Sequence, residues 1–247
     1  MSRSKFTTEQ LVDRWEDQRD IKNLMGIYSN YIILNEDAKV VNDLWADKDD
    51  ICLGSNDGWY IGKEAVAAYY AAVTERNKLV ASLIKKRLPE KTEGKSEEEL
   101  FGIGTFRVLP VSCPVIEVAG DGKTAKGLFY CMGAHAEVEE IGPNSKWSWG
   151  YYAVDFLRDG SEEGNNWKIW HMSYTNDVDS RCGESWGMEL SCRPNLPEFK
   201  ELGEYKLPEY TKRESIREFW NPGRPLSGAP RLPEAYETFS ETFSYGA

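Results

Sequence analysis

Two histidines are the residues in this sequence best suited to acid–base chemistry. His135 and His171 both lie in segments whose β-branched and aromatic residues predict strands, and imidazole exchanges protons readily near neutral pH. Alternation along a strand places His135 on one face with Cys131, and His171 on one face with Ile169 and Ser173. If both faces point to the concave side of a sheet, the two imidazoles converge. The alternative is that each is a hydrogen-bonded histidine of the core or the rim.

Two phenols and an amide follow one stripe of the first predicted helix. Tyr28 and Tyr31 are three residues apart, and Asn35 follows at the end of the same stripe. A buried phenol can donate a hydrogen bond to a substrate oxygen that gains charge, which stabilises an oxyanion without a metal. The alternative is a pair of amphipathic core tyrosines, with Asn35 as a helix-end residue.

Aromatic residues around these groups predict the walls of an apolar pocket. We expect Trp59, Trp149 and Tyr151 to contact a substrate. Alternation also places Asp155 on the face of Trp149 and Tyr151, where burial without partners raises a carboxyl pKa and makes a general acid or base. The alternative for Asp155 is a solvent-facing or salt-bridged carboxylate.

The composition excludes several classes of protein. The 247 residues include 41 acidic and 30 basic side chains, a formal charge of −11, which disfavours a nucleic-acid groove and an anionic membrane surface. There is no apolar run of about 20 residues, no signal-peptide core and no Cys-x-x-Cys pair, so we expect a cytoplasmic protein with reduced thiols. Phosphate-loop, dinucleotide and zinc motifs are absent, and we predict no cofactor and no metal.

The order of the predicted elements indicates an α+β fold. Helices are expected from Thr7 to about residue 35, then over 37–45 and 63–88, and the charged stretch 90–99 is expected to be a loop. Short strands are expected at 51–53 and 59–61, followed by a meander of four strands at 107–118, 124–138, 146–157 and 167–174. Helices followed by a sheet predict that the helices cover one face of an antiparallel sheet.

The last part of the chain has a different character. Seven of the eleven prolines lie between Pro194 and Pro233, yet aromatic residues recur up to Tyr245. We therefore expect an extended, Pro- and aromatic-rich C-terminal arm at residues 179–247, which packs on its own domain or on a neighbouring subunit.

Several segments together resemble the SnoaL-like proteins of the NTF2-like, or cone-fold, superfamily. The segments are RDIKNLMGIYSNY at 19–31, DLWA at 43–46, WYIGKEAVAAYY at 59–70, GDGKTAKG at 120–127, WSWGYY at 147–152 and NWKIWHMSY at 166–174. The resemblance covers about residues 5–178 and implies a domain over 1–178 in which a curved sheet and N-terminal helices enclose a conical pocket.

The resemblance also implies a range of functions. Relatives include ketosteroid isomerase, scytalone dehydratase, polyketide cyclases and cofactor-free lyases acting on lignin-derived aromatics. Tyr28, Tyr31, His135 and His171 match the pocket residues of scytalone dehydratase loosely, whereas Ser55 stands near the position of the isomerase's general base, which disfavours that reaction.

We therefore expect a cofactor-independent lyase or dehydratase that acts on a small, largely apolar, aromatic substrate. His135 or His171 moves the proton, Tyr28 and Tyr31 polarise the substrate, and Asn35, Trp59, Trp149, Tyr151 and Asp155 surround it. The alternatives are a non-catalytic binding protein of the same fold and a structural subunit of an aromatic-ring dioxygenase. The self-contained aromatic arm favours a homo-oligomer, a dimer or trimer, over an obligate partner.

Overall fold

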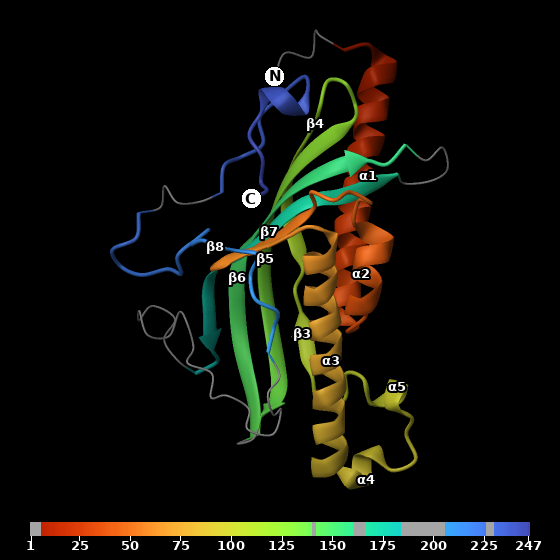
Figure 1. The fold of residues 1–247 in the computed structure, drawn as a ribbon, viewed down its shortest axis with the longest axis vertical. Helices are drawn as coiled ribbons and strands as arrows, with labels where there is room; N and C mark the ends of the chain where they lie inside the picture. The colour runs from red at the N-terminus through yellow and green to blue at the C-terminus, as the bar shows by residue number, and fades with distance from the viewer. Residues whose placement is uncertain (1–5, 140–141, 161–165, 184–205, 226–229) are drawn as a thin grey trace.

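The structure is a computed structural model that describes residues 6–139, 142–160, 166–183, 206–225 and 230–247. Two long helices and a short one lie on one side of a twisted sheet, and the C-terminal segment runs along the other side (Figure 1). The fold is therefore α+β, as the sequence predicts, with the helices segregated to one face.

The helices begin and end close to the predicted residues. Helix α1 spans Thr8–Ile33 and starts with the predicted capping box, in which Thr7 and Gln10 bond each other's backbone amides. Helix α2 spans Asp37–Leu44 and α3 spans Lys63–Arg87. The prediction of a loop at 90–99 was wrong, because two single-turn helices occur there, α4 at Pro89–Thr92 and α5 at Glu97–Leu100. Helix α5 has a second capping box, between Ser96 and Glu99, which sequence inspection overlooked.

The sheet has eight strands, of which three long ones dominate. Its order is β3-β5-β6-β7-β1-β2-β8, with β4 also paired to β5, and every described pairing is antiparallel except that of β1 with β7. The strands are β1 (Cys52–Ser55), β2 (Gly58–Ile61), β3 (Phe106–Val108), β4 (Val111–Val118), β5 (Thr124–Glu139), β6 (Gly142–Arg158), β7 (Trp167–Arg181) and β8 (Lys212–Arg213). The strand predicted over 107–118 is thus two strands, separated at Leu109 and Pro110.

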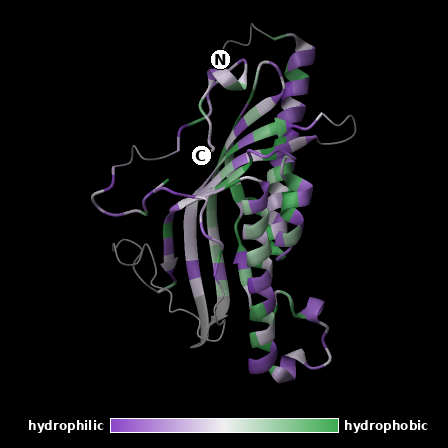
Figure 2. Ribbon diagram, in the orientation of Figure 1, coloured by the Kyte–Doolittle hydropathy of each residue, from purple (hydrophilic) through white to green (hydrophobic). Residues whose placement is uncertain are grey.

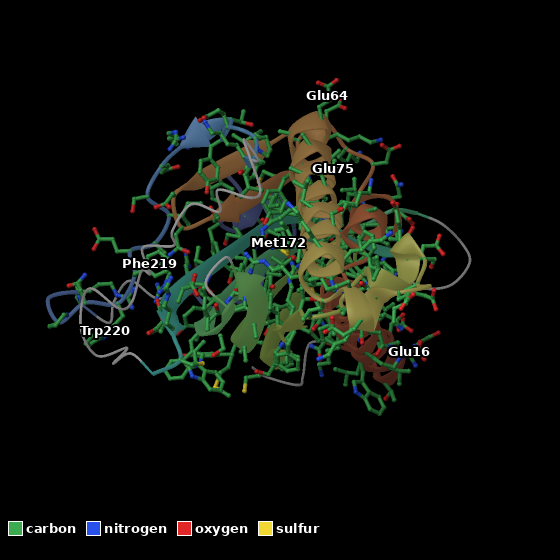
Figure 3. The ribbon with its side chains drawn as sticks, turned by 90° about the horizontal axis from the view of Figure 1, so that it is seen from below. Glu16, Glu64, Glu75, Met172, Phe219 and Trp220 are labelled. Atoms are coloured by element: carbon green, nitrogen blue, oxygen red, sulfur yellow. The ribbon has the colours of Figure 1, made fainter. Side chains whose placement is uncertain are left out.

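The two faces of the sheet have different neighbours. On the inner face, Phe129, Tyr152 and Phe156 pack with residues of α1 such as Tyr28 in the main hydrophobic core. Figure 2 shows hydrophobic residues gathered where the helices meet the sheet, and Figure 3 shows Met172 in this interior beside α3.

The described parts of the C-terminal region lie along the β2 edge and over the outer face. Residues 209–217 follow the β2 edge, where Asn56 accepts the amide of Ile216 and donates to the carbonyl of Arg217. Residues 230–247, the C-terminal segment, cover the other end of β5–β7, where Tyr245 packs with Leu128 and Ala153. These parts of the predicted arm therefore pack on their own sheet. Phe219 and Trp220 also lie on the side away from α3 (Figure 3).

Two irregularities in the β6–β7 pairing decide which side chains share a face. The register shifts between Trp149 and Gly150 and again between Asp155 and Phe156, so that Trp170 and Asp177 are extra residues in β7. Bulges of this kind bend the strands and curve the sheet. None of the described helices is long and apolar enough to cross a membrane.

Candidate functional site

A histidine and a carboxylate meet on the inner face, at the end of the sheet remote from α1's N-terminus. His135 on β5 is in phase with the core residues Phe129 and Cys131. Its Nε2 lies 3.4 Å from Oγ of Ser148 and 3.7 Å from Oδ1 of Asp179, and Ser148 donates a hydrogen bond of 3.2 Å to that same carboxylate oxygen. An Nε2–H that donates toward Ser148 and Asp179 leaves Nδ1 as the proton acceptor. His135 and Asp179 are each about one quarter exposed, so both are accessible to solvent.

An arginine stands directly beside this histidine. Arg107 on β3 is the register partner of His135, so both side chains leave the sheet on the same face. Its guanidinium bonds the carboxylate of Asp37 at 3.4 and 3.5 Å, and Asn77 on α3 donates to Asp37 at 3.1 Å. Asp37 is only 1% exposed, and burial raises its pKa although Arg107 opposes the shift. The site thus combines a fixed cation with a proton acceptor.

Buried phenols form the interior wall behind these groups. Tyr152 stacks on Tyr174 with ring centroids 4.5 Å apart and meets Tyr28 edge-on at 5.6 Å. Burial raises the pKa of Tyr28, Tyr70 and Tyr174, so all three are neutral hydrogen-bond donors. Within the described residues, the hydroxyls of Tyr70 and Tyr174 have no partner with standard hydrogen-bond geometry, although they interact with Tyr28 and with Cys131 and Asn176, respectively. They can therefore serve the oxygen of a bound molecule.

The cavity beside Arg107 is small. It is lined by Asn35, Asn77, Arg107, Leu100 and Ile103, among others, and has a volume of about 20 Å³. This space suits a water molecule and not an aromatic substrate. A larger molecule fits at this position only if residues that line the cavity move.

The two histidines do not point to the same face, so the condition for their convergence is not met. The register shift pairs Phe156 with Ile169 but Asp155 with His171, so Ile169 points into the core and His171 points to the outer face. On that face His171 Nδ1 lies 2.9 Å from Oδ2 of Asp155. The extra residue, Trp170, stacks on the His171 ring at 4.3 Å. The expectation that Ile169 and His171 share a face is wrong, because Trp170 is an extra residue between them and interrupts the inward–outward alternation of the strand.

Asp155 lies at the centre of a buried charged network on the outer face. It accepts Lys126 Nζ at 2.6 Å, Ser244 Oγ at 2.9 Å and the backbone amide of Tyr245 at 2.8 Å, in addition to His171. Lys126 and Asp155 are both fully buried. The Lys126 ammonium also lies near four aromatic rings of the C-terminal segment, at 4.6–5.9 Å from the centroids of Tyr236, Phe239, Phe243 and Tyr245. This network anchors the chain terminus, and the salt-bridged alternative for Asp155 is the one observed.

The other predicted site residues divide between the two faces. Asn35 lines the small inner cavity, where its φ of 57° ends α1 in the left-handed region. Trp59, Trp149 and Tyr151 belong to the outer face, and Tyr151 donates to the hydroxyl of Tyr130 at 2.9 Å. Tyr31 lies outside the inner site, because its hydroxyl donates to Asp43 at 2.8 Å near the surface. The inner site therefore retains Tyr28, Asn35 and His135 from the predicted set.

Sequence reasoning did not select Arg107, Asp37, Asn77 or Tyr70. Each is an isolated polar residue in an element that is predicted from its apolar pattern. The residues that contact one another lie up to 70 positions apart in the sequence. Asp37 had one local signal, because it is an acid at the start of a predicted helix. An acid at this position is also explained by ordinary helix capping. In the part of the chain that the structure describes, no three His, Cys, Asp or Glu side chains are grouped to hold a metal ion.

Comparisons with known proteins find solved structures that match with low sequence identity and low TM-score. No family model and no curated protein matches the chain. The solved structures that match include the protein Kfla4162 from Kribbella flavida (14% identity, TM-score 0.48, covering 68% of this chain and 95% of that one). A hexachlorocyclohexane dehydrochlorinase of the LinA-type3 kind from Novosphingobium barchaimii shares 11% identity with a TM-score of 0.47, covering 70% and 95%.

A third match is an NTF2-like superfamily protein from Salmonella enterica serovar Typhimurium, with 16% identity, a TM-score of 0.43 and coverage of 70% and 99%. Because these identities and TM-scores are low, none of the matches supports an inference about activity, substrate or partners.

Proposed function

We propose that the protein is a cofactor-independent lyase of the dehydratase type, acting at the inner face on a small, largely apolar aromatic substrate. The observation that carries the proposal is the line from His135 through Ser148 to Asp179, placed beside Arg107. A histidine whose Nε2 bonds a serine hydroxyl that in turn donates to a carboxylate, with Nδ1 open, is an arrangement that serves general-base catalysis.

The reaction assigned to these groups is a β-elimination. Nδ1 of His135 takes a proton from the carbon next to a carbonyl group, the electron pair forms a carbon–carbon double bond, and the C–O bond to the β-hydroxyl breaks. The protonated imidazole returns its proton to the departing oxygen, so water leaves and the enzyme regains its starting state. Arg107 and the phenols of Tyr70 and Tyr174 stabilise the negative charge that develops on the carbonyl oxygen.

A substrate analogue tests the proposal directly. We would incubate the protein with 3-hydroxy-1-phenylpropan-1-one and measure phenyl vinyl ketone by chromatography and, in D₂O, deuterium uptake at the carbon next to the carbonyl by NMR. His135→Gln should lower both rates by a factor of about 10² or more, because a positioned general base contributes that much. His171→Gln is the matched control, since it removes the other imidazole on the opposite face and should leave both rates nearly unchanged.

The outcomes distinguish the alternatives. If His171→Gln abolishes the reaction while His135→Gln leaves it intact, the inner site is not catalytic. Binding of the analogue with neither elimination nor deuterium uptake would contradict catalysis and support the non-catalytic binding protein. Circular dichroism of each variant establishes that the loss of rate is not a loss of fold.

A further inference from the structure

The outer face has a groove that the proposed reaction does not use. It lies between the sheet and the C-terminal segment and has a volume of about 310 Å³. Its floor consists of Ala153 on β6 with Ser173 and Thr175 on β7, and Ala153 and Ser173 are register partners. Because these side chains are small, the sheet is hollowed at this point. The volume is at the lower end of the range for small-molecule sites.

Aromatic and aliphatic side chains form the walls. Trp59 on β2 and Ile216 stand on one side, and Phe243 and Tyr245 stand on the other. Phe243 and Tyr245 pack edge to face with centroids 5.0 Å apart. The backbone amide of Tyr245 donates a hydrogen bond to Asp155, which holds the residue in place. Walls fixed in this way suit a flat ring that packs against aromatic side chains.

The polar groups of the groove are hydroxyls and guanidinium groups. Ser173 and Thr175 are buried among the floor residues, and both line the groove. Arg217 and Arg231 also line the groove. Such hydroxyls and cations at the border of an apolar hollow are the groups that bind a carboxylate.

Arginine side chains lie in and beside the groove. Arg217 and Arg224 both bond the single carboxylate of Asp177, at 2.6 and 2.9 Å. Arg231 lies over the ring of Phe243 at 4.5 Å, with Glu234 as its exposed partner. Guanidinium groups on the border of an apolar groove can bond the carboxylate of a ligand.

We propose that this groove is a binding site for a small aromatic monocarboxylate. The ring lies between Trp59 and the Phe243–Tyr245 pair, above the floor of Ala153. The carboxylate faces Arg217 and Arg231, within reach of the Ser173 and Thr175 hydroxyls. The proposal does not depend on the lyase activity, because the groove and His135 are on opposite faces of the sheet.

Isothermal titration with benzoate tests the site on the full chain. Benzoate should bind, and benzamide, which has the same ring without the charge, should bind about tenfold more weakly or not at all. Arg231→Gln should weaken benzoate binding by about fivefold, the effect of losing a partly exposed charge contact. Ser173→Leu should abolish binding by filling the hollow.

Matched variants locate the site. Arg213→Gln removes an exposed arginine elsewhere on the outer side, where Glu209 is its partner, and should leave benzoate binding unchanged. Arg107→Gln removes the inner-face cation and should also leave it unchanged. The proposal is overturned if benzoate does not bind up to about 10 mM, if benzamide binds equally well, or if Arg107→Gln weakens binding while Arg231→Gln does not. Arg231 is more than half exposed, so its variant is informative even if Ser173→Leu fails to fold.

Discussion

His135 and His171 lie on opposite faces of one sheet, on strands that are separated only by β6. His135 faces the helices and shares its Nε2 environment with Ser148 and Asp179, whereas His171 is held by Asp155 beneath the C-terminal segment. The two imidazoles therefore serve different parts of the molecule. One is accessible and suited to proton transfer, and the other belongs to a buried network that attaches the chain terminus.

The first prediction concerns the stability of that network. Asp155→Asn removes the carboxylate from the buried Lys126 ammonium and leaves a charge without its counterion. Breaking a buried ion pair from one side costs about 3–5 kcal/mol, so the free energy of unfolding in urea should fall by that order. Glu209→Gln is the control, because its ion pair with Arg213 is exposed and should contribute nothing measurable. Equal stabilities of the two variants would contradict the role given to Asp155.

The second prediction uses the raised pKa of Asp37. A carboxyl whose pKa is higher in the folded than in the unfolded chain favours folding at low pH, and this contribution is lost as the pH rises from the ordinary value of 3.8 through the folded-state pKa. The free energy of unfolding of the wild type relative to Asp37→Asn should therefore decrease over that window and then level off.

Urea unfolding of both proteins at several pH values above 3.8 measures this difference. The other titrating groups are common to the two proteins, so their contributions largely cancel. A difference that rises with pH would mean that the Arg107 guanidinium outweighs the burial of Asp37, and that its pKa is lowered.

The third prediction concerns the bulge that curves the sheet. A Cβ added at Gly150 would lie against the carbonyl oxygen of Thr175 and 2.8 Å from Cα of Asn176, and both are backbone atoms. Gly150→Ala should destabilise the protein by about 1–3 kcal/mol or more, because backbone yields less easily than a side chain. Gly26→Ala in α1 is the matched control, as nothing lies within 4 Å of its added Cβ. That variant should be more stable by about 0.5–1 kcal/mol.

The sequence predicts correctly which side chains share a face of a strand wherever the alternation along that strand is uninterrupted. Along β6 the prediction that Trp149, Tyr151 and Asp155 share one face and Tyr152 and Phe156 the other agrees with the structure, because no residue is inserted between Gly150 and Phe156 relative to β5. Along β7 the same reasoning failed at Ile169 and His171. The insertion of Trp170 is defined only by pairing with β6 and has no local signature.

The candidate site was less predictable for a related reason. The side chain of Arg107 points inward because β3 pairs with β5, and the paired residues are distant in the sequence. The contact of Arg107 with Asp37 joins a strand to a helix. Helix periodicity did place Tyr28 in the core. It could not show that Tyr31, one turn later, bonds Asp43 at the surface, because that depends on where α2 packs.

The last prediction separates a catalytic from a structural role for Tyr174. Its hydroxyl is buried and interacts with Cys131 and Asn176, but among the described residues it has no partner with standard hydrogen-bond geometry. Tyr174→Phe should therefore leave the free energy of unfolding unchanged or raise it by about 1 kcal/mol. If the phenol stabilises the developing oxyanion, elimination from 3-hydroxy-1-phenylpropan-1-one should slow by about tenfold or more, mainly in kcat. Tyr31→Phe should leave the rate unchanged, since Tyr31 lies outside the inner site. A Tyr174→Phe protein with wild-type kcat would show that the phenol only fills space beside Tyr152.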